Sequence, residues 1–226
     1  MKFLVSNDDG VAAPGLSALV EVLSELGEVT VVAPAQELSG CSHQTTTHSP
    51  LQVTQLAPDR HMVEGTPADC VRLGLLHLAP DVDWVFSGIN NGGNLGVDVY
   101  MSGTVAAARE AAWMGKPAIA LSQYRRSKEP VVWTTVIPQV HRVIAHLRSE
   151  TLPAGAFWNV NLPERDQAAQ EARIVTCPLE AAPLPVRYEI QNGQFHYRAT
   201  YQDRPRNPGS DVDVCFSGDI AVTRIP

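Results

Sequence analysis

The 226-residue chain has little basic charge. Its 17 Lys and Arg residues face 24 Asp and Glu residues, and the formal net charge is −7. Such a balance repels nucleic acid and anionic membranes unless a basic patch offsets it. The densest basic group, Arg125, Arg126 and Lys128, is explained by a solvated loop. We therefore expect no nucleic-acid duplex and no membrane as partners, and a phosphorylated substrate would need a local cation or a nest of backbone donors.

Long apolar runs and paired cysteines are also lacking. The first residues, MKFLVSNDDG, hold an apolar stretch too short for a signal peptide, and no run approaches the roughly eighteen apolar residues of a membrane span. The cysteines, Cys41, Cys70, Cys177 and Cys215, form no C-x-x-C pair, which argues against a zinc knuckle. We expect a cytoplasmic protein with reduced thiols.

Widespread catalytic and nucleotide-binding signatures are absent as well. The chain has no G-x-S-x-G elbow, no G-x-x-x-x-G-K-[ST] loop, and no G-x-G-x-x-G after its first strand. Serine esterase chemistry, P-loop NTP hydrolysis and dinucleotide binding all lose support from these absences.

What the sequence contains is an alternation of strand and helix patterns. Residues 2–6 predict a buried strand, residues 14–26 carry apolar residues at helical spacing, and residues 28–34 predict a second strand. Further helices are expected over 66–78 and 104–115, and further strands over 51–56, 61–63, 83–88 and 117–122. Repeated βαβ units imply right-handed crossovers. We expect an α/β fold, a doubly wound and mostly parallel sheet with ligands at the carboxyl ends of its strands.

The pattern changes near residue 130. Residues 131–150 predict a long helix kinked at Pro138, short strands are expected in 157–163 and 173–179, and alternation about Asn192-Gly193 predicts a hairpin over 186–202. An isolated two-stranded hairpin is marginal in water, so this one is expected to pack on another subunit. We expect one domain over 1–226, with the core and site in 1–129 and the helix, further strands and hairpin in 130–226.

Two adjacent carboxylates, Asp8 and Asp9, follow the first strand directly. Because parallel strands end at one edge of the sheet, they should lie near Ser39 and Gly40 and near the loop 88–96. Neighbouring carboxylates repel one another, and a divalent cation removes that conflict. Oxygen ligands suit Mg²⁺, Mn²⁺ or Ca²⁺ rather than zinc. The alternative is that one aspartate caps the next segment while the other faces water; the convergence of loops favours the cation.

The stretch SGT at Ser102, Gly103 and Thr104 stands at the predicted start of a helix. Free amide groups and the helix dipole favour a phosphate at such a position. Ser102 or Thr104 as a plain N-cap is a compatible alternative.

The stretch GTPADC, residues 65–70, has a local structural explanation. Thr66 is expected to be an N-cap, Pro67 the first helical residue and Asp69 part of the first turn. We favour this interpretation over a catalytic Asp69.

Five ordered segments resemble a known family. SNDDGVAAPG, VVAPAQELSG, GTPADCV, SGINNGGNLG and SGTVAAARE are similar to motifs of the SurE family of metal-dependent 5′/3′-nucleotidases, in the same order and at similar spacing. The match is dense over about the first 122 residues and looser in NPGSDVDVCFSGDIAVTRIP. The resemblance implies a Rossmann-like core with a C-terminal hairpin extension, and an enzyme that hydrolyses nucleoside monophosphates to nucleoside and phosphate.

The resemblance also implies roles for individual residues and partners. Asp8 and Asp9 would be catalytic, and one divalent cation per subunit, Mg²⁺ or Mn²⁺ and in a crystal also Ca²⁺, would be held by Asp8, Asp9, Ser39 and Asn90. The substrate phosphate would lie beside Asn94, Ser102, Gly103 and Thr104, with the Gly40 amide as a further donor. The expected partners are a nucleoside monophosphate and further copies of the chain, in a homodimer or homotetramer assembled through the 186–202 hairpin.

Two questions stay open at this level. The group that attacks phosphorus is either a water activated by the cation or Asp8 itself, which would form an aspartyl-phosphate. A nucleotide sensor without hydrolysis, or a receiver-like phosphorylation switch, is the alternative to an enzyme. The switch needs a phosphoacceptor aspartate at the end of a later strand, whereas DWVFSGIN ends in Ser, Gly and Asn.

Overall fold

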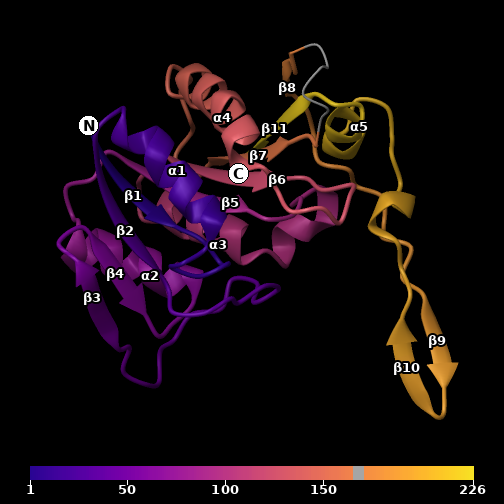
Figure 1. Cartoon of the computed structure of the whole chain (residues 1–226), viewed down its shortest axis with the longest axis horizontal. Helices are drawn as coiled ribbons and strands as arrows, with labels where there is room; N and C mark the ends of the chain where they lie inside the picture. The colour runs from indigo at the N-terminus through magenta and orange to yellow at the C-terminus, as the bar shows by residue number, and fades with distance from the viewer. Residues whose placement is uncertain (165–170) are drawn as a thin grey trace.

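A computed structural model describes residues 1–164 and 171–226 of the chain. Within these residues, nine strands form one sheet in the order β3-β4-β2-β1-β5-β6-β7-β11-β8, and β9 and β10 form a separate ribbon (Figure 1). The strands are β1 (Lys2–Ser6), β2 (Glu28–Pro34), β3 (Val53–Ala57), β4 (Arg60–Val63), β5 (Trp84–Asn90), β6 (Ala118–Gln123), β7 (Phe157–Leu162), β8 (Ile174–Thr176), β9 (Tyr188–Gln191), β10 (Gln194–Tyr197) and β11 (Ile220–Ile225).

Parallel pairing dominates the sheet. β4, β2, β1, β5, β6 and β7 pair in parallel along the sheet, β3 is antiparallel to β4, and β11 is antiparallel to β7. The expected doubly wound, mostly parallel α/β fold is confirmed.

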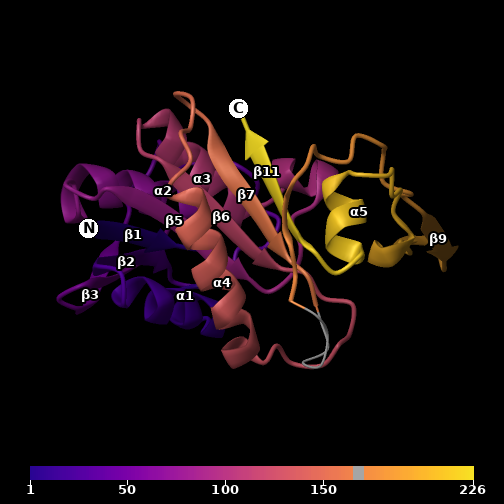
Figure 2. The ribbon, with the colours of Figure 1, turned by 90° about the horizontal axis from the view of Figure 1, so that it is seen from above.

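Helices cover both faces of this sheet. The α-helices are α1 (Pro14–Ser24), α2 (Pro67–Leu73), α3 (Gly103–Trp113), α4 (Trp133–Leu147) and α5 (Asp211–Phe216). α1 and α4 lie side by side on one face, and α2 and α3 cover the other (Figure 2). Single turns of other helix types lie at Gly74–Leu78, Gly96–Tyr100 and Tyr201–Asp203.

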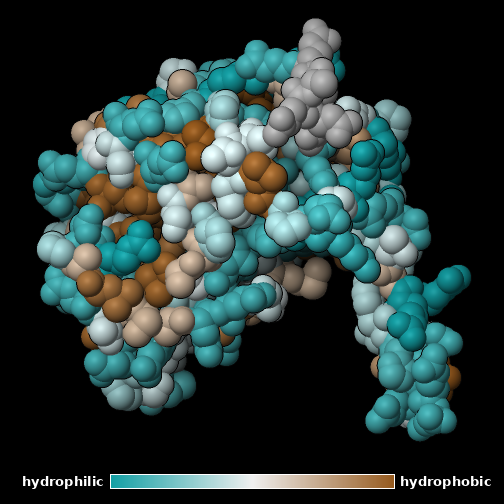
Figure 3. Space-filling model, in the orientation of Figure 1, coloured by the Kyte–Doolittle hydropathy of each residue, from teal (hydrophilic) through white to brown (hydrophobic). Residues whose placement is uncertain are grey.

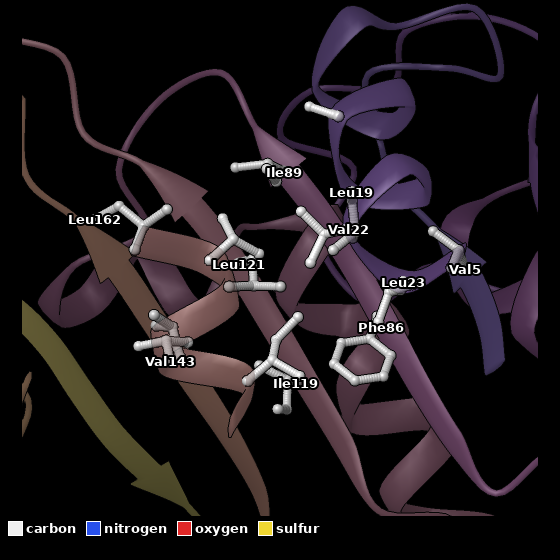
Figure 4. Packing of buried hydrophobic residues seen from close by; sticks show 14 of the residues in the cluster. Val5, Leu19, Val22, Leu23, Phe86, Ile89, Ile119, Leu121, Val143 and Leu162 are labelled. Carbon is white, nitrogen blue, oxygen red and sulfur yellow. The ribbon is translucent and has the colours of Figure 1, made fainter. Parts of the chain in front are cut away.

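The alternation of side chains along the strands creates two cores. In β1, Phe3 and Val5 pack with the apolar residues of α1 and α4, whereas Leu4 packs with those of α2 and α3. This division follows from the two-residue repeat of a strand. Figure 4 shows the first core, where Val5 and Phe86 lie near Leu23 of α1.

Alanines of α3 hold this helix close to the sheet. Ala107, Ala108 and Ala111 are fully buried and share a core with Ala118 and Ala120 of β6. Small side chains on both surfaces allow a short distance between helix and strand, and the dense packing that results resists movement. The start of α3 is thereby fixed at the carboxyl edge of the sheet.

The structure differs from the sequence expectation at several elements. The helix expected over 66–78 is α2 followed by a π-helical turn at Gly74–Leu78. The long helix expected through Pro138 is present as α4. α5 and β11 were not anticipated. α5 has six residues, too few for a helical repeat to show, and β11 finds its place only through pairing with the distant β7.

The expected hairpin is present and projects from the body as an arm (Figures 1 and 3). In its register Tyr188 faces Tyr197 and Ile190 faces Phe195, so one side of the ribbon is apolar. All four of these side chains are more than half exposed. Among the described residues, no helix has both the length and the apolar character to cross a membrane.

Candidate functional site

Asp8 lies at the carboxyl end of β1 and contacts the start of α3. It is 4% exposed, and the Thr104 hydroxyl donates a hydrogen bond to its Oδ1. The backbone N–H groups of Gly103 and Thr104 also donate to this carboxylate. The sequence-predicted neighbours Asp8, Gly103 and Thr104 are therefore in direct contact, and the helix start directs its donors at a carboxylate.

Gly103 allows this contact because it has no side chain. A Cβ at this position would lie 2.8 Å from the Asp8 Cβ and 2.8 Å from the Cys41 Sγ. No real Cβ approaches atoms so closely, so a larger residue would separate α3 from the end of β1. The glycine of the SGT stretch thus sets the position of Asp8 against the helix.

Asp9 is only partly buried and turns toward the loop after β5. The Asn91 backbone N–H donates to Asp9 Oδ2 over 3.2 Å. Burial, the charge of Asp8 and the charge of Glu37 together raise the pKa of Asp9 to about 6. Burial likewise raises the pKa of Asp8. The charges that act on Asp9 are all negative, so a cation placed between these carboxylates would relieve a real electrostatic cost.

The loop with Ser39 and Gly40 reaches this site from β2. The Leu38 N–H donates to the Asp8 carbonyl oxygen over 2.8 Å, and the exposed Ser39 hydroxyl donates to Glu37 Oε1 over 2.7 Å. Gly40 has a φ of +75° and open space around it. Sequence reasoning missed Glu37, since a single glutamate in a polar loop carries no local signal.

The two asparagines of the loop after β5 have different surroundings. Asn90, at the end of β5, donates from Nδ2 to the Gly92 carbonyl over 2.8 Å, which uses the nitrogen of its amide and not the oxygen that a cation would take. Asn94 is 7% exposed and donates from Nδ2 to the Ser122 hydroxyl over 2.7 Å. Its backbone N–H donates to Asn161 Oδ1 over 2.7 Å. Asn94 thus fastens the loop to β6 and β7.

A set of buried polar residues holds this loop from behind. Arg204 donates to both carboxylate oxygens of Asp98, over 2.8 and 3.1 Å, and the Tyr201 hydroxyl donates to the same group over 2.9 Å. The Gly96 N–H donates to Asp211 over 2.7 Å. We call Asp98, Glu180, Tyr201, Arg204 and Asp211 the rear network. It fixes the loop that carries Asn90 and Asn91 to the C-terminal part of the chain.

Ser102 is the N-cap of α3. Its hydroxyl accepts a hydrogen bond from the Val105 N–H over 3.1 Å, which confirms the capping interpretation. Capping leaves the helix dipole in place, so the start of α3 keeps its affinity for negative charge.

Asp69 has the structural role that the sequence predicts. The Thr66 hydroxyl accepts from the Asp69 N–H, and the Asp69 carboxylate accepts from the Thr66 N–H over 3.0 Å, which forms a capping box with Pro67 in the first turn. The same carboxylate accepts from the Thr46 N–H over 2.9 Å. The capping box therefore also anchors the loop that carries Ser39.

The donors at this edge match a hard cation in type. Among residues 1–164 and 171–226, no group of three or more His, Cys, Asp or Glu side chains is arranged to hold a metal ion. The predicted set instead combines the carboxylates of Asp8 and Asp9 with the hydroxyl of Ser39 and the amide oxygen of Asn90. All are oxygen ligands, which Mg²⁺ and Mn²⁺ prefer, and the uncompensated charge of the two aspartates fits a divalent ion.

Comparison with known proteins identifies the family. The family described as survival protein SurE matches residues 3–182 of the chain. The chain belongs to the SurE family. A relative from Synechocystis sp. is 47% identical over 100% of this chain and 99% of its own length. The "5′-nucleotidase SurE" of Alkalilimnicola ehrlichii is 41% identical over 100% of this chain and 89% of that protein.

A solved structure of the SurE family shares the fold. The crystal structure of the SurE protein from Aquifex aeolicus superimposes with a TM-score of 0.85 at 33% sequence identity, covering 100% of this chain and 93% of that one. The family recognised from five ordered motifs is confirmed, and those motifs meet at the carboxyl edge of the sheet.

Proposed function

We propose that this SurE-family protein is a 5′-nucleotidase, a metal-dependent phosphomonoesterase that hydrolyses nucleoside monophosphates to nucleoside and phosphate. The observation that carries the proposal is the pair of adjacent carboxylates, Asp8 buried against the start of α3 and Asp9 partly buried beside it, with no compensating positive charge among the described residues. The names of relatives such as the "5′-nucleotidase SurE" of Nitrosococcus oceani, 38% identical over 100% of this chain, support it.

The proposed cation ligands are Asp8, Asp9, Ser39 and Asn90. A bound Mg²⁺ or Mn²⁺ would supply a positive charge for the phosphate and would lower the pKa of a bound water. Asp8 is held in place by Thr104 and by the backbone of α3, so it keeps its orientation without help from solvent.

The proposed phosphate site consists of N–H and polar side-chain donors. At the helix start of Ser102, Gly103 and Thr104, the Gly103 and Thr104 N–H groups and the Thr104 hydroxyl donate to Asp8 in this structure. With a cation on that carboxylate, they would share these hydrogen bonds with the phosphoryl oxygens. The amide of Gly40 would add a donor, and Asn94 would shape the loop beside them. Donors held by the helix backbone stabilise charge as it moves onto the phosphoryl oxygens.

Water is the proposed attacking group. The Asp8 carboxylate already accepts hydrogen bonds from the Thr104 hydroxyl and from the helix backbone, and these occupy oxygen lone pairs that an attack on phosphorus would need. Quenching with acid during turnover of ³²P-labelled substrate should therefore leave no label on the protein. Label on Asp8 would instead establish an aspartyl-phosphate.

Phosphate release from purified protein tests the function itself. AMP, GMP and p-nitrophenyl phosphate are incubated with Mn²⁺ or with EDTA. We expect release with Mn²⁺ and none with EDTA. Tight binding of AMP without release would identify a nucleotide sensor in place of an enzyme.

We also propose that the protein is a homodimer or homotetramer assembled through the 186–202 hairpin. Two strands are marginal in water, and the apolar side of this ribbon, with Tyr188, Ile190, Phe195 and Tyr197, is exposed. Light scattering after size exclusion should give a multiple of the 24.5 kDa chain mass. Phe195→Asp should lower that mass, whereas Gln194→Asp on the polar side should not; a monomeric wild type would refute the assembly.

A further inference from the structure

A cavity of about 520 Å³ lies between β6, α4 and the end of β7, at the carboxyl edge of the sheet. Residues of the segment between β6 and α4 form one wall, and Pro163, directly after β7, contributes to another. Its volume falls in the range of small-molecule sites. Apolar side chains including Pro130, Val131, Val136 and Pro163 line much of it.

Two glutamines that line this cavity have side-chain oxygens without a hydrogen-bond partner in the described part of the chain. Gln123 is 4% exposed and donates from Nε2 to the Tyr124 carbonyl over 2.9 Å. Its Oε1, like the Oε1 of Gln139 on α4, is buried and has no hydrogen-bond partner among the described residues. Buried polar atoms without partners are rare and costly. Both residues line the cavity, and a ligand with donors on its edge would satisfy these oxygens once the side chains turn toward it.

Hydrogen bonds through Asn91 link a residue of the cavity lining to the proposed active site. Asn91 donates from its backbone to Asp9 over 3.2 Å and accepts at its side chain from Arg125 Nη1 over 3.1 Å. Arg125 itself lines the cavity. One residue, Asn91, therefore separates the carboxylates from the rim, and a group linked to a bound phosphate would reach the cavity past Asn91 and Arg125.

A second cavity, of about 510 Å³, flanks the site on the β2 and β4 side. Thr46 and Thr66 in its lining are already paired: Thr46 donates to Asp69 from its N–H and its hydroxyl, and the Gln44 carbonyl accepts from Thr66. This cavity is the alternative place for a ligand beside the site, and a variant that fills it distinguishes the two.

We propose that the cavity between β6, α4 and β7 binds the nucleobase of the nucleoside monophosphate. The proposal rests on the proposed function and adds the subsite that selects a nucleotide over other phosphomonoesters. The ring system packs against Val131 and Pro163, and its heteroatom edge meets the amides of Gln123 and Gln139. An amide offers both a donor and an acceptor, which matches the neighbouring donors and acceptors of a base edge.

Filling the cavity tests the proposal. Thr135 is exposed on the first turn of α4 and lines the cavity, so Thr135→Trp places an indole there without disturbing the core. We expect KM for AMP to rise about tenfold or more, as for a lost set of packing and polar contacts. The kcat/KM for ribose 5-phosphate, which has no base, should stay within about twofold. Gln139→Leu should raise KM for AMP about tenfold by removing one polar partner.

Two matched controls use cavities of similar size. Ala154→Trp fills a cavity of about 570 Å³ lined by Pro117 and Ala156, residues that precede β6 and β7 at the opposite edge of the sheet, and should leave both substrates unaffected. Gln44→Trp fills the cavity on the β2 and β4 side and should also leave AMP unaffected. If Gln44→Trp selectively raises KM for AMP and Thr135→Trp does not, the base binds on the β2 and β4 side and the proposal is wrong.

Adenosine binding separates this proposal from the proposed function, because it needs neither metal nor turnover. Ligand-detected NMR should show adenosine binding to the wild type and to Ala154→Trp, weakened about tenfold or more in Thr135→Trp. If the protein hydrolyses AMP but Thr135→Trp does not weaken adenosine binding, the proposed base site is wrong and the proposed nucleotidase function is retained. If Thr135→Trp weakens adenosine binding but the protein does not hydrolyse AMP, the proposed function is wrong and the proposed base site is retained.

Discussion

Two groups of carboxylates on either side of one loop have opposite electrostatic surroundings. In front of the loop that follows β5, Asp8 and Asp9 have pKa values raised by burial, and for Asp9 the neighbouring charges of Asp8 and Glu37 raise the pKa further. Behind the loop, Asp98 is paired with Arg204, whose side chain is 4% exposed. We call Asp8 and Asp9 the front group. The front group has an excess of negative charge, whereas the rear network contains the positive charge of Arg204.

Glu180 shows how the rear network compensates buried charge. Burial alone would raise the pKa of Glu180, but hydrogen bonds from Ala182 and Asn207 outweigh it and lower that pKa to about 2. Asp211 is the exception, since burial raises its pKa despite N–H donors from Gly96 and Glu180. Burial by itself therefore does not mark a functional carboxylate, whereas a pKa that stays raised by burial together with neighbouring negative charge, as at Asp9, does.

Removing a front carboxylate should have the largest effect. Asp8→Asn keeps the shape of the side chain and can still accept from Thr104, so the fold should tolerate it, and the cost of burying a charge disappears. We expect phosphate release to fall by at least about 10³-fold, as when a group that stabilises transition-state charge is lost. The melting temperature should stay equal or rise. If Asp8→Asn instead lowers the melting temperature and keeps the activity, Asp8 has a structural role and not a catalytic one.

Removing the carboxylate of Asp98 from the rear network should lower the stability of the protein. Asp98→Asn leaves Arg204 buried with its charge uncompensated, which costs about 3 kcal/mol in the free energy of unfolding. Urea titration measures it. The exposed pair Glu189-Arg198, 3.0 Å apart, is the control: Glu189→Gln should cost less than about 1 kcal/mol. Equal losses in the two variants would contradict the distinction between the rear network and a surface ion pair.

A divalent cation should stabilise the folded protein by binding at Asp8 and Asp9 and not at the rear network. Mn²⁺ at about 100 times its dissociation constant should add about 2.7 kcal/mol to the free energy of unfolding, and EDTA should remove that increment. Asp9→Asn should abolish the increment, whereas Asp98→Asn should retain it on a lower baseline. An increment that survives Asp9→Asn would place the cation elsewhere.

The smallest expected effect is on the acid stability that Glu180 confers. Its pKa of about 2 lies below the ordinary 4.5, so the unfolded chain binds this proton first and stability falls as pH drops from about 4.5 toward 2. Above pH 4.5 this contribution is fully present. In Glu180→Gln the free energy of unfolding should be lower at neutral pH and should decline less between pH 5 and 3. An unchanged slope over this interval would contradict the lowered pKa.

Local sequence patterns predicted where in the fold Asp8 and Asp9 lie. The apolar run of β1, the capped start of α2 and the glycines after β5 each carry a signal within a few residues, and together they place Asp8 and Asp9 at the carboxyl edge of a parallel sheet. The order of the motifs then indicated the family.

The rear of the site could not be predicted in this way. Arg204 reaches Asp98 across 106 positions, and Asp211 reaches Gly96 across 115. No short-range repeat encodes such a pairing, because it depends on where β11 and α5 pack. The π-helical turn after α2 was missed for the same reason: the π-turn places Gly74 against Leu4 of β1, where a Cβ would lie 2.6 Å from Leu4 Cδ2.

The long sequence separation within the rear network also has a consequence for the order in which the protein is made. The loop after β5 leaves the ribosome before the residues that support it, since Asp211 follows Gly96 by 115 positions. At roughly 5–20 residues per second, this delay lasts from several seconds to about twenty. During that interval the nascent chain carries the carboxylates of Asp8 and Asp9 beside a loop that lacks the support of Arg204 and Asp211. Competence for ligand binding should therefore appear late and abruptly, when the C-terminal segment docks, and should not grow gradually as the sheet is built.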